Sequence, residues 1–244
     1  SYTDLTATAD MMAAIDAEGS YEPGSSDTSA IITGQDNQMT LAKMYVVPFD
    51  DTETWDKLLN QLTTEEMTRI VTGSALSTIP SIAYPAMFMK DGPQGNQLRT
   101  YVEDGTSATG FCGEVLRACS FNRDLMYEVG TAMGEDWYRT ETVGAYTPAV
   151  NIHRTPYAGR NFEYYSEDGF LSGELATQEV EGLQNHGVIC YIKHFVLNDQ
   201  ETNRQGICTF SNEQAIREIY LKAFEKPFTE GKAVSYTHLT LPTI

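Results

Sequence analysis

Residues 151–168 read NIHRTPYAGRNFEYYSED, and residues 193–204 read KHFVLNDQETNR. Each stretch follows a short apolar run, at Ala145–Val150 and Val188–Ile192, and precedes a segment in which apolar residues recur at helical spacing. Such runs are typical of strands that are buried on both faces in a parallel sheet. Both stretches are therefore expected at the carboxyl ends of parallel strands, where an α/β barrel carries its functional side chains.

The surrounding sequence continues this alternation of strands and helices. A further strand is expected at Ala86–Lys90, directly before Asp91-Gly-Pro. The expected helices are Glu114–Cys119, Leu125–Thr140 with Asn122 as N-cap, Leu171–His186 followed by Gly187, and a last helix capped by Ser211-x-x-Gln214. Repeated strand–helix units imply an α/β fold with a parallel sheet covered on both faces. We interpret it as an incomplete (β/α)8 TIM-like barrel with an irregular N-terminal arm.

Residues 1–50 differ from the rest because Ser, Thr, Gly, Asp and Ala dominate up to about residue 37. They are interpreted as a linker or extended arm that forms no core and holds at most one short helix near Ala9–Ala17. From Trp55 onward, apolar residues recur at helical spacing, and Thr63-Thr-Glu-Glu66 has the form of a capping box. A pair of helices is expected there.

The chain ends unusually. After Val234 a further strand and its loop are expected, but residues 235–244 read SYTHLTLPTI. This tail resembles a translated sequencing-adapter read, so we interpret residues 235–244 as non-native and the reading frame as truncated. The alternative is a native C-terminal strand.

The charge balance is strongly acidic, with 34 Asp and Glu against 16 Lys and Arg, a net charge of −18. An acidic surface disfavours binding to nucleic acid and to anionic membranes, and no stretch approaches the ~20 apolar residues of a membrane span. The four cysteines and four histidines lack ligand spacing, so neither a metal nor another cofactor is expected. Neither a signal peptide nor a disulfide pattern is visible, which favours a cytoplasmic location, although the chain starts at Ser1 rather than Met.

Four polar residues stand at or shortly after the expected strand ends: Asp91, Arg160, Lys193 and His194. Because strand ends on one face of a barrel converge, these side chains can line a single pocket. The carboxylate can accept hydrogen bonds from two adjacent hydroxyls while the cations donate to oxygens, a combination that suits a sugar. Singly, each is more often a surface salt-bridge partner.

Four ordered motifs carry a resemblance to a known family. They are Asp91-Gly-Pro-Gln-Gly, Asn151-Ile-His-Arg-x-Pro, Gly159-Arg-Asn-Phe-Glu-Tyr-Tyr-Ser-Glu-Asp168 and Lys193-His-Phe-x-x-Asn-Asp-Gln-Glu-Thr-x-Arg204. Together they resemble the N-terminal barrel of glycoside hydrolase family 3, the β-glucosidase-like enzymes, and residues 51–234 are interpreted as part of that domain.

The resemblance implies retaining hydrolysis of terminal β-linked sugars by an aspartate nucleophile and a glutamate acid/base. It implies that Asp91, Arg160, Lys193 and His194 bind the −1 sugar. It also implies that both catalytic carboxyls lie outside this chain, the glutamate in a sandwich domain that we expect to have been lost from the N-terminal side. The fragment alone is therefore expected to be inactive.

One position departs from the family pattern. Members often carry an arginine six residues after the motif aspartate, whereas this chain has Gln97, with Arg99 two residues further on. Either Arg99 takes over the role of that arginine, or the sugar is held more weakly and the specificity differs.

Other carboxylates offer a second reading of the chemistry: Glu163, Glu167, Asp168, Asp199 and Glu201. The family pattern favours a loop-bracing role for them, and likewise for His153 and Arg154. Glu135-Asp136-Trp137 superficially resembles the nucleophile motif but falls inside an expected helix, so we reject it. The alternative function is a non-catalytic sugar-binding barrel domain that shares the pocket and lacks the carboxyl pair.

Overall fold

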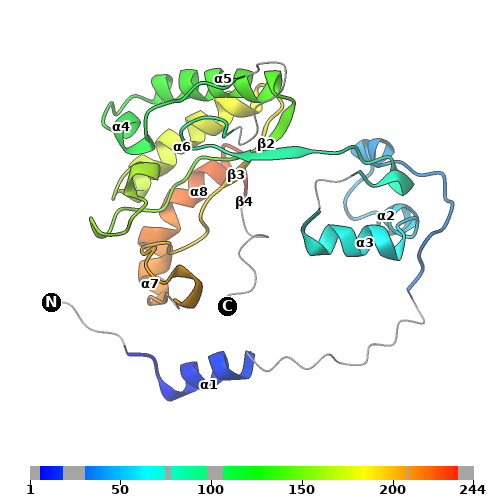
Figure 1. The fold of residues 1–244 in the computed structure, drawn as a ribbon, viewed down its shortest axis with the longest axis horizontal. Helices are drawn as coiled ribbons and strands as arrows, with labels where there is room; N and C mark the ends of the chain where they lie inside the picture. The colour runs from blue at the N-terminus through cyan, green and yellow to red at the C-terminus, as the bar shows by residue number, and fades with distance from the viewer. Residues whose placement is uncertain (1–5, 19–30, 75–77, 98–106, 208, 236–244) are drawn as a thin grey trace.

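The computed structural model describes residues 6–18, 31–74, 78–97, 107–207 and 209–235. Three parts are visible in Figure 1: an α/β unit, a small helical lobe around α2 and α3, and the separate helix α1, Ala9–Glu18. The short helix expected in the arm is confirmed. Arg99 and residues 236–244, on which two of the sequence expectations depend, lie outside the described residues.

The sheet is parallel and its strands follow one another in chain order, β1-β2-β3-β4. The strands are β1, Phe88–Asp91, β2, Thr142–Tyr146, β3, Ile189–Ile192, and β4, Val234–Ser235. Asp91 pairs with Tyr146 in the register of β1 and β2. All three pairings are parallel, which confirms the α/β class and the parallel sheet. Four consecutive parallel strands are compatible with part of a barrel.

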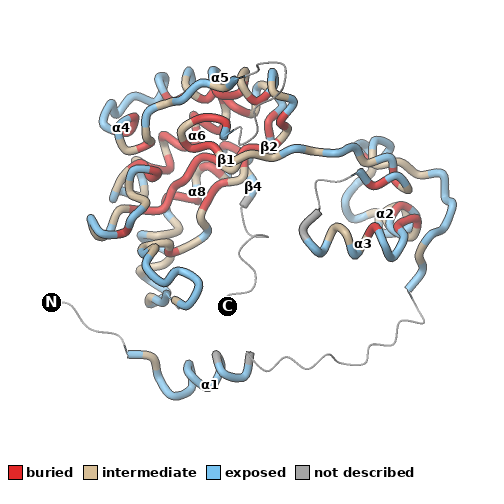
Figure 2. The backbone as a smooth tube through the Cα atoms, viewed as in Figure 1, coloured by how far each residue is buried: buried red, intermediate tan, exposed pale blue. Residues whose placement is uncertain are grey.

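The core lies between this sheet and a layer of helices (Figure 2). The helices are α4, Glu114–Ala118, α5, Arg123–Arg139, α6, Gly169–Gln184, and α8, Lys222–Thr229. Their buried apolar side chains include Met133, Trp137, Leu175, Val180 and Phe224. Burial of such side chains is the main favourable contribution to folding.

Helices α5 and α6 pack closely because glycines lie at their contact. A Cβ on Gly130 would be 2.2 Å from Glu179 O, and one on Gly182 would be 2.5 Å from Tyr127 O. Real Cβ atoms do not approach so closely, so the spacing of the two helices depends on these glycines. The α5–α6 contact therefore fixes the position of α6, which also packs against β3.

Strand β2 ends earlier than expected. The apolar run predicted a strand over Ala145–Val150, but β2 ends at Tyr146. Pro148 has no N–H to donate, which interrupts the ladder. Pairing resumes as an isolated bridge between Ala149 and Lys193, and Val150 N donates to Lys193 O at 2.8 Å. The boundary was wrong, but the segment still runs beside β3.

The helical segment near the C-terminus also differs from its expected form. Ser211 was expected to cap it, but the Asn212 side chain accepts from Ala215 N at 2.8 Å. Asn is among the best N-caps, and it stands one residue nearer to the helix. The helix is divided into α7, Glu213–Ala215, a π-turn at Ile216–Tyr220, and α8.

The small lobe contains α2, Thr52–Leu59, and α3, Thr64–Arg69, followed by a π-turn at Ile70–Ser74. Thr63 and Glu66 form the predicted capping box, with both reciprocal hydrogen bonds present. Two 3₁₀ segments, Leu41–Val46 and Pro80–Ile82, complete the lobe.

Part of the N-terminal arm contributes to the core of this lobe. Met44 is 3% exposed and clusters with Leu58, Leu62, Ile79 and Ile82. The expectation that residues 1–50 contribute to no core is therefore wrong for the Met44 segment. The polar composition that suggested an arm ends near residue 37, so apolar residues from Met39 onward can pack.

Candidate functional site

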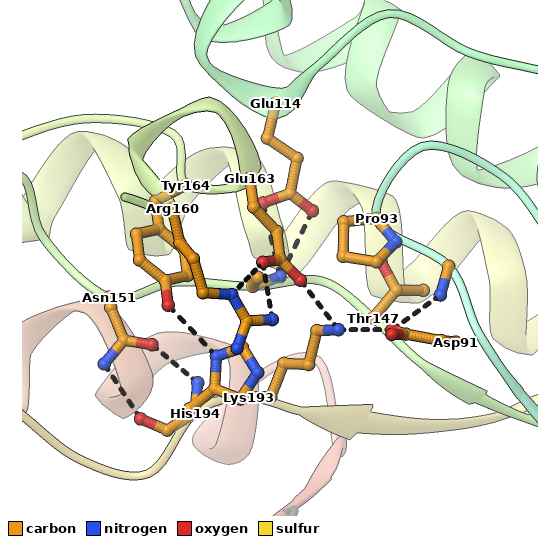
Figure 3. A network of polar contacts seen from close by, with 12 residues as sticks. Asp91, Pro93, Glu114, Thr147, Asn151, Arg160, Glu163, Tyr164, Lys193 and His194 are labelled. Atoms are coloured by element: carbon orange, nitrogen blue, oxygen red, sulfur yellow. Dashed lines mark hydrogen bonds and ion pairs between the residues drawn. The ribbon is translucent and has the colours of Figure 1, made fainter. Parts of the chain in front are cut away.

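Two predicted site residues that lie far apart in the sequence meet directly. Asp91 is the last residue of β1, and Lys193 follows β3 immediately. Lys193 Nζ donates a hydrogen bond to Asp91 Oδ1, across 102 positions of sequence (Figure 3). The Asp91 side chain is 36% exposed, whereas that of Lys193 is 2% exposed. The carboxylate therefore faces solvent and the ammonium lies beneath it.

Glu163 connects this pair to Arg160. Its Oε1 lies 2.8 Å from Lys193 Nζ, and its Oε2 accepts from Arg160 Nε at 2.6 Å. Arg160 directly precedes a 3₁₀ turn, Asn161–Glu163, and the side chains of Arg160 and Glu163 point toward each other (Figure 3). Burial lowers the pKa of Arg160, but the hydrogen bond and the charge of Glu163 raise it by a larger amount, so the net shift is upward. Asp91, Lys193, Glu163 and Arg160 thus form one chain of alternating charges.

This alternation explains how a buried lysine stays in place. An unpaired buried ammonium is very unfavourable, whereas one with two carboxylate partners is compensated by charge and hydrogen bonds. Lys193 has three N–H groups, of which two contact Asp91 and Glu163. The third can donate to another oxygen.

His194 is held on the other side by backbone and side-chain contacts. Asn151 Nδ2 donates to His194 O at 2.8 Å, and His194 N donates to Asn151 Oδ1 at 2.6 Å. Tyr164 Oη lies 3.1 Å from His194 Nδ1. Burial, followed by the charges of Arg160 and Lys193, lowers the pKa of His194 to about 2, so the imidazole is neutral.

Outer contacts brace the second loop. Asn198 Nδ2 donates to Tyr164 Oη at 2.7 Å and to Glu201 Oε1 at 2.9 Å. Arg204 donates to Glu201 Oε2 at 2.9 Å. Burial raises the pKa of Glu201, but Asn198 and Arg160 lower it more, so it remains ionised. An open cavity of about 770 Å³ adjoins Glu201 and Arg204.

A buried network beneath the strand ends was not anticipated. Arg117 of α4 forms a 2.7 Å salt bridge with Glu179 of α6 and donates to Pro93 O at 2.5 Å. Glu114 accepts from Ala149 N at 3.1 Å. Burial, and then the charge of Glu179, raises the pKa of Glu114 well above its usual value. The network ties the loops after β1 and β2 to the helices.

One signal in the sequence could have revealed this network. Glu114 and Arg117 stand three residues apart on one short helix. Glu179 shares a helix face with the apolar residues Leu175, Ala176 and Leu183. A carboxylate among apolar neighbours at a core-facing position requires a buried cation. The pairing across 62 residues, however, depends on the packing of α4 against α6.

Two of the alternative carboxylates, Asp168 and Asp199, form local contacts of the bracing kind that the family pattern suggested. Asp168 caps α6 by accepting from Phe170 N and Leu171 N. Burial raises the pKa of Asp199, and a hydrogen bond from Tyr220 only partly offsets this shift. His153 Nε2 lies 3.0 Å from Tyr164 O. Glu135, Asp136 and Trp137 lie inside α5, as expected.

The departure at Gln97 can be described only in part. Gln97 is exposed, and its backbone N–H donates to Asp91 O at 2.9 Å. Arg99 lies beyond the described residues. Among the residues that the structure describes, no group of three His, Cys, Asp or Glu is arranged to hold a metal ion, and no helix has the length and apolarity to cross a membrane.

The fold and the site define an α/β protein whose parallel strands bring a carboxylate, two cations and an imidazole together at their carboxyl ends. Residues 52–244 match the glycosyl hydrolase family 3 N-terminal domain. The chain belongs to this family.

Relatives and solved structures agree with this assignment. Beta-glucosidase A of Butyrivibrio fibrisolvens is 42% identical over 181 residues, which are 70% of this chain and 22% of the relative. The structure of beta-glucosidase 3B from Thermotoga neapolitana in complex with alpha-D-glucose shares 46% identity with a TM-score of 0.61, covering 64% of this chain and 22% of that one. A beta-glucosidase structure from Paenibacillus barengoltzii reaches a TM-score of 0.70 at 29% identity, covering 86% of this chain and 23% of that one. The chain thus spans about a fifth of the length of these proteins.

Proposed function

We propose that this chain is the sugar-holding part of a family 3 β-glycosidase, one that hydrolyses terminal β-linked sugars with retention when the remaining domains are present. The contact between Asp91 and Lys193 carries the proposal. It places an exposed carboxylate over a row of donors, and among the described residues no hydrogen bond to Asp91 Oδ2 is found. That oxygen can accept from sugar hydroxyls while Lys193, Arg160 and His194 contact the others.

The charge pattern favours binding over bond cleavage by these residues. A retaining site needs two carboxyls about 5 Å apart, one free to attack and one able to donate a proton. Glu163 is instead shared by Lys193 and Arg160, and Glu201 by Arg204 and Asn198. We propose that the nucleophile and the acid/base belong to segments that the longer relatives contain, the latter in a sandwich domain.

Binding of methyl β-D-glucopyranoside to the 244-residue chain, followed by NMR titration, tests the proposal. The Asp91→Asn variant should weaken binding about tenfold or more, because one charge-assisted hydrogen bond becomes neutral. Lys193 keeps Glu163 as its partner in this variant, so the fold should persist. Asp124→Asn, at an exposed position of α5, is the matched control and should bind like the parent.

Two results would contradict the proposal. Equal binding by the parent and Asp91→Asn would show that Asp91 does not contact the sugar. Robust turnover of an aryl β-glucoside by this chain, abolished by a substitution within it, would show that it holds its own catalytic carboxyls.

A non-catalytic sugar-binding domain would share the same pocket, so binding alone does not separate the two functions. The DNA that flanks the coding sequence does. A downstream Ser-Asp-Trp-like motif, the form that the family resemblance implies for the nucleophile, supports the enzyme, and a native stop codon after Ile244 supports the binding domain.

A further inference from the structure

The hydrogen-bond partners of Tyr164 determine which nitrogen of His194 carries its hydrogen. The Tyr164 ring is 1% exposed, and its hydroxyl has two partners among the described residues, Asn198 Nδ2 and His194 Nδ1. A hydroxyl has one hydrogen to donate, and its oxygen can accept. The direction of each of the two hydrogen bonds follows from the groups beyond them.

The direction of the hydrogen bond between Asn198 and Tyr164 is set by Glu201. Its carboxylate is held by Arg204 at 2.9 Å, with Arg160 at 3.6 Å, and as an ionised group it can only accept. Asn198 must therefore turn its NH₂ group, not its carbonyl oxygen, toward Glu201, from which it lies 2.9 Å. The second hydrogen of the same nitrogen donates to Tyr164 Oη.

The remaining step follows by elimination. Since the Tyr164 oxygen accepts from Asn198, its own hydrogen has His194 Nδ1, 3.1 Å away, as the acceptor. The opposite arrangement, with a hydrogen on Nδ1, would leave a buried O–H without an acceptor among the described residues, which is unfavourable. Nδ1 is therefore the bare nitrogen of a neutral ring.

We propose that Tyr164 and Asn198 are positioning residues that hold His194 as its Nε2–H tautomer, so that the ring offers a sugar oxygen a hydrogen-bond donor. The role toward the sugar rests on the proposed function, whereas the tautomer itself does not. The Nε2 edge lies on the side of the ring turned away from Tyr164 (Figure 3). Asn151 fixes the backbone of His194 at both its N–H and its carbonyl, and the Tyr164 ring lies edge-on to the imidazole with the ring centroids 6.0 Å apart.

The consequence is that hydrogen-bond donors and acceptors are separated among the residues of the site. His194, Lys193 and Arg160 all present donors, and Asp91 alone among these four residues presents an acceptor. A hydroxyl that lies between Asp91 and a donor can donate to the first and accept from the second. A ligand group that only donates, such as an ammonium, finds no acceptor on the imidazole.

Long-range ¹⁵N–¹H NMR of the imidazoles in the ligand-free 244-residue chain at neutral pH tests the tautomer. The chain has four histidines, and His194→Gln identifies the signal of His194. The parent should show bare Nδ1 and protonated Nε2. Tyr164→Phe should shift both ¹⁵N signals toward a mixture of tautomers. Tyr165→Phe removes a neighbouring buried hydroxyl that bonds Glu179 instead, and should leave the signals unchanged.

Asn198→Asp supplies a test in the opposite direction. Its carboxylate would accept from Tyr164, whose oxygen would then accept from Nδ1–H, so the tautomer should reverse. A parent with protonated Nδ1, or signals unmoved in both Tyr164→Phe and Asn198→Asp, would overturn the proposal. Failure to bind methyl β-D-glucopyranoside, with the Nε2–H tautomer still observed, would count against the proposed function and not against the tautomer.

Discussion

Arg117 of α4 and Glu179 of α6 form a 2.7 Å salt bridge in which the two side chains are 2% and 0% exposed. The same guanidinium donates to Pro93 O, two residues beyond Asp91, and Tyr165 donates to the same Glu179 oxygen. The pair therefore links two helices to the loop that follows β1. Its position, more than its energy, makes it relevant to the site.

Replacing Arg117 by methionine should destabilise the chain strongly. The change leaves Glu114 and Glu179 buried without their cation, and breaking a buried ion pair in this way costs about 3–5 kcal/mol. The free energy of unfolding, measured in urea, should fall by that order. Arg139→Met is the control, because its guanidinium is 71% exposed and its pairing with Glu135 lies at the surface. Similar losses in both variants would contradict the assigned role.

Replacing Lys193 by methionine should affect both stability and ligand binding. Glu163 keeps Arg160 as a partner, but Asp91 loses its cation. We expect a stability loss smaller than in Arg117→Met, because Asp91 is partly exposed to water, together with a loss of sugar binding. Urea unfolding and the NMR titration measure the two effects. Lys57→Met, on an exposed helix face, is the control and should alter neither stability nor binding. Unchanged binding in Lys193→Met would show that the ammonium does not contact the sugar.

The sequence predicted the class of fold, the parallel strands and the helices that cover them, because apolar periodicity and capping residues act locally. It also placed Asp91 and Lys193 at strand ends, and the parallel register then brings them together. A loop-bracing role for Glu163 was predicted, but not its contact with Lys193, nor the roles of Asn198 and Tyr164. Their partners lie on other elements, and no local pattern encodes those distances. The end of β2 was missed because Pro148 interrupts pairing inside an apolar run.

The α5–α6 contact should not tolerate a side chain at Gly182. A Cβ there would lie 2.5 Å from Tyr127 O and 2.6 Å from Thr131 N, both backbone atoms that cannot move alone. Gly182→Ala should therefore separate the helices and reduce the free energy of unfolding by about 1–3 kcal/mol, as overpacking does. Gly110→Ala, where nothing lies within 4 Å, is the control. Equal thermal midpoints for the two variants would show that the helices are not in tight contact.

Acid should destabilise the fold through His194. Its folded pKa is lowered to about 2 by burial and by Arg160 and Lys193, whereas an unfolded histidine has a pKa of about 6.5. Between these values the unfolded chain binds a proton that the native chain does not, so stability falls as the pH falls. The contribution is at most about 1.4 kcal/mol per pH unit. Above about pH 6.5 both states are neutral and the effect vanishes.

His194→Gln removes the group that takes up this proton in the unfolded chain, while keeping a side chain that can form hydrogen bonds. Urea unfolding at a series of pH values should therefore give a shallower loss of stability for the variant below about pH 6.5, where histidine titrates in the unfolded chain. The carboxylates titrate in both proteins and cancel in the difference. Two curves that stay parallel from neutral pH down through the acid range would mean that His194 takes up its proton in the native state. In that case both ring nitrogens of His194 would carry a hydrogen at acid pH, and Tyr164 could not donate to Nδ1 there.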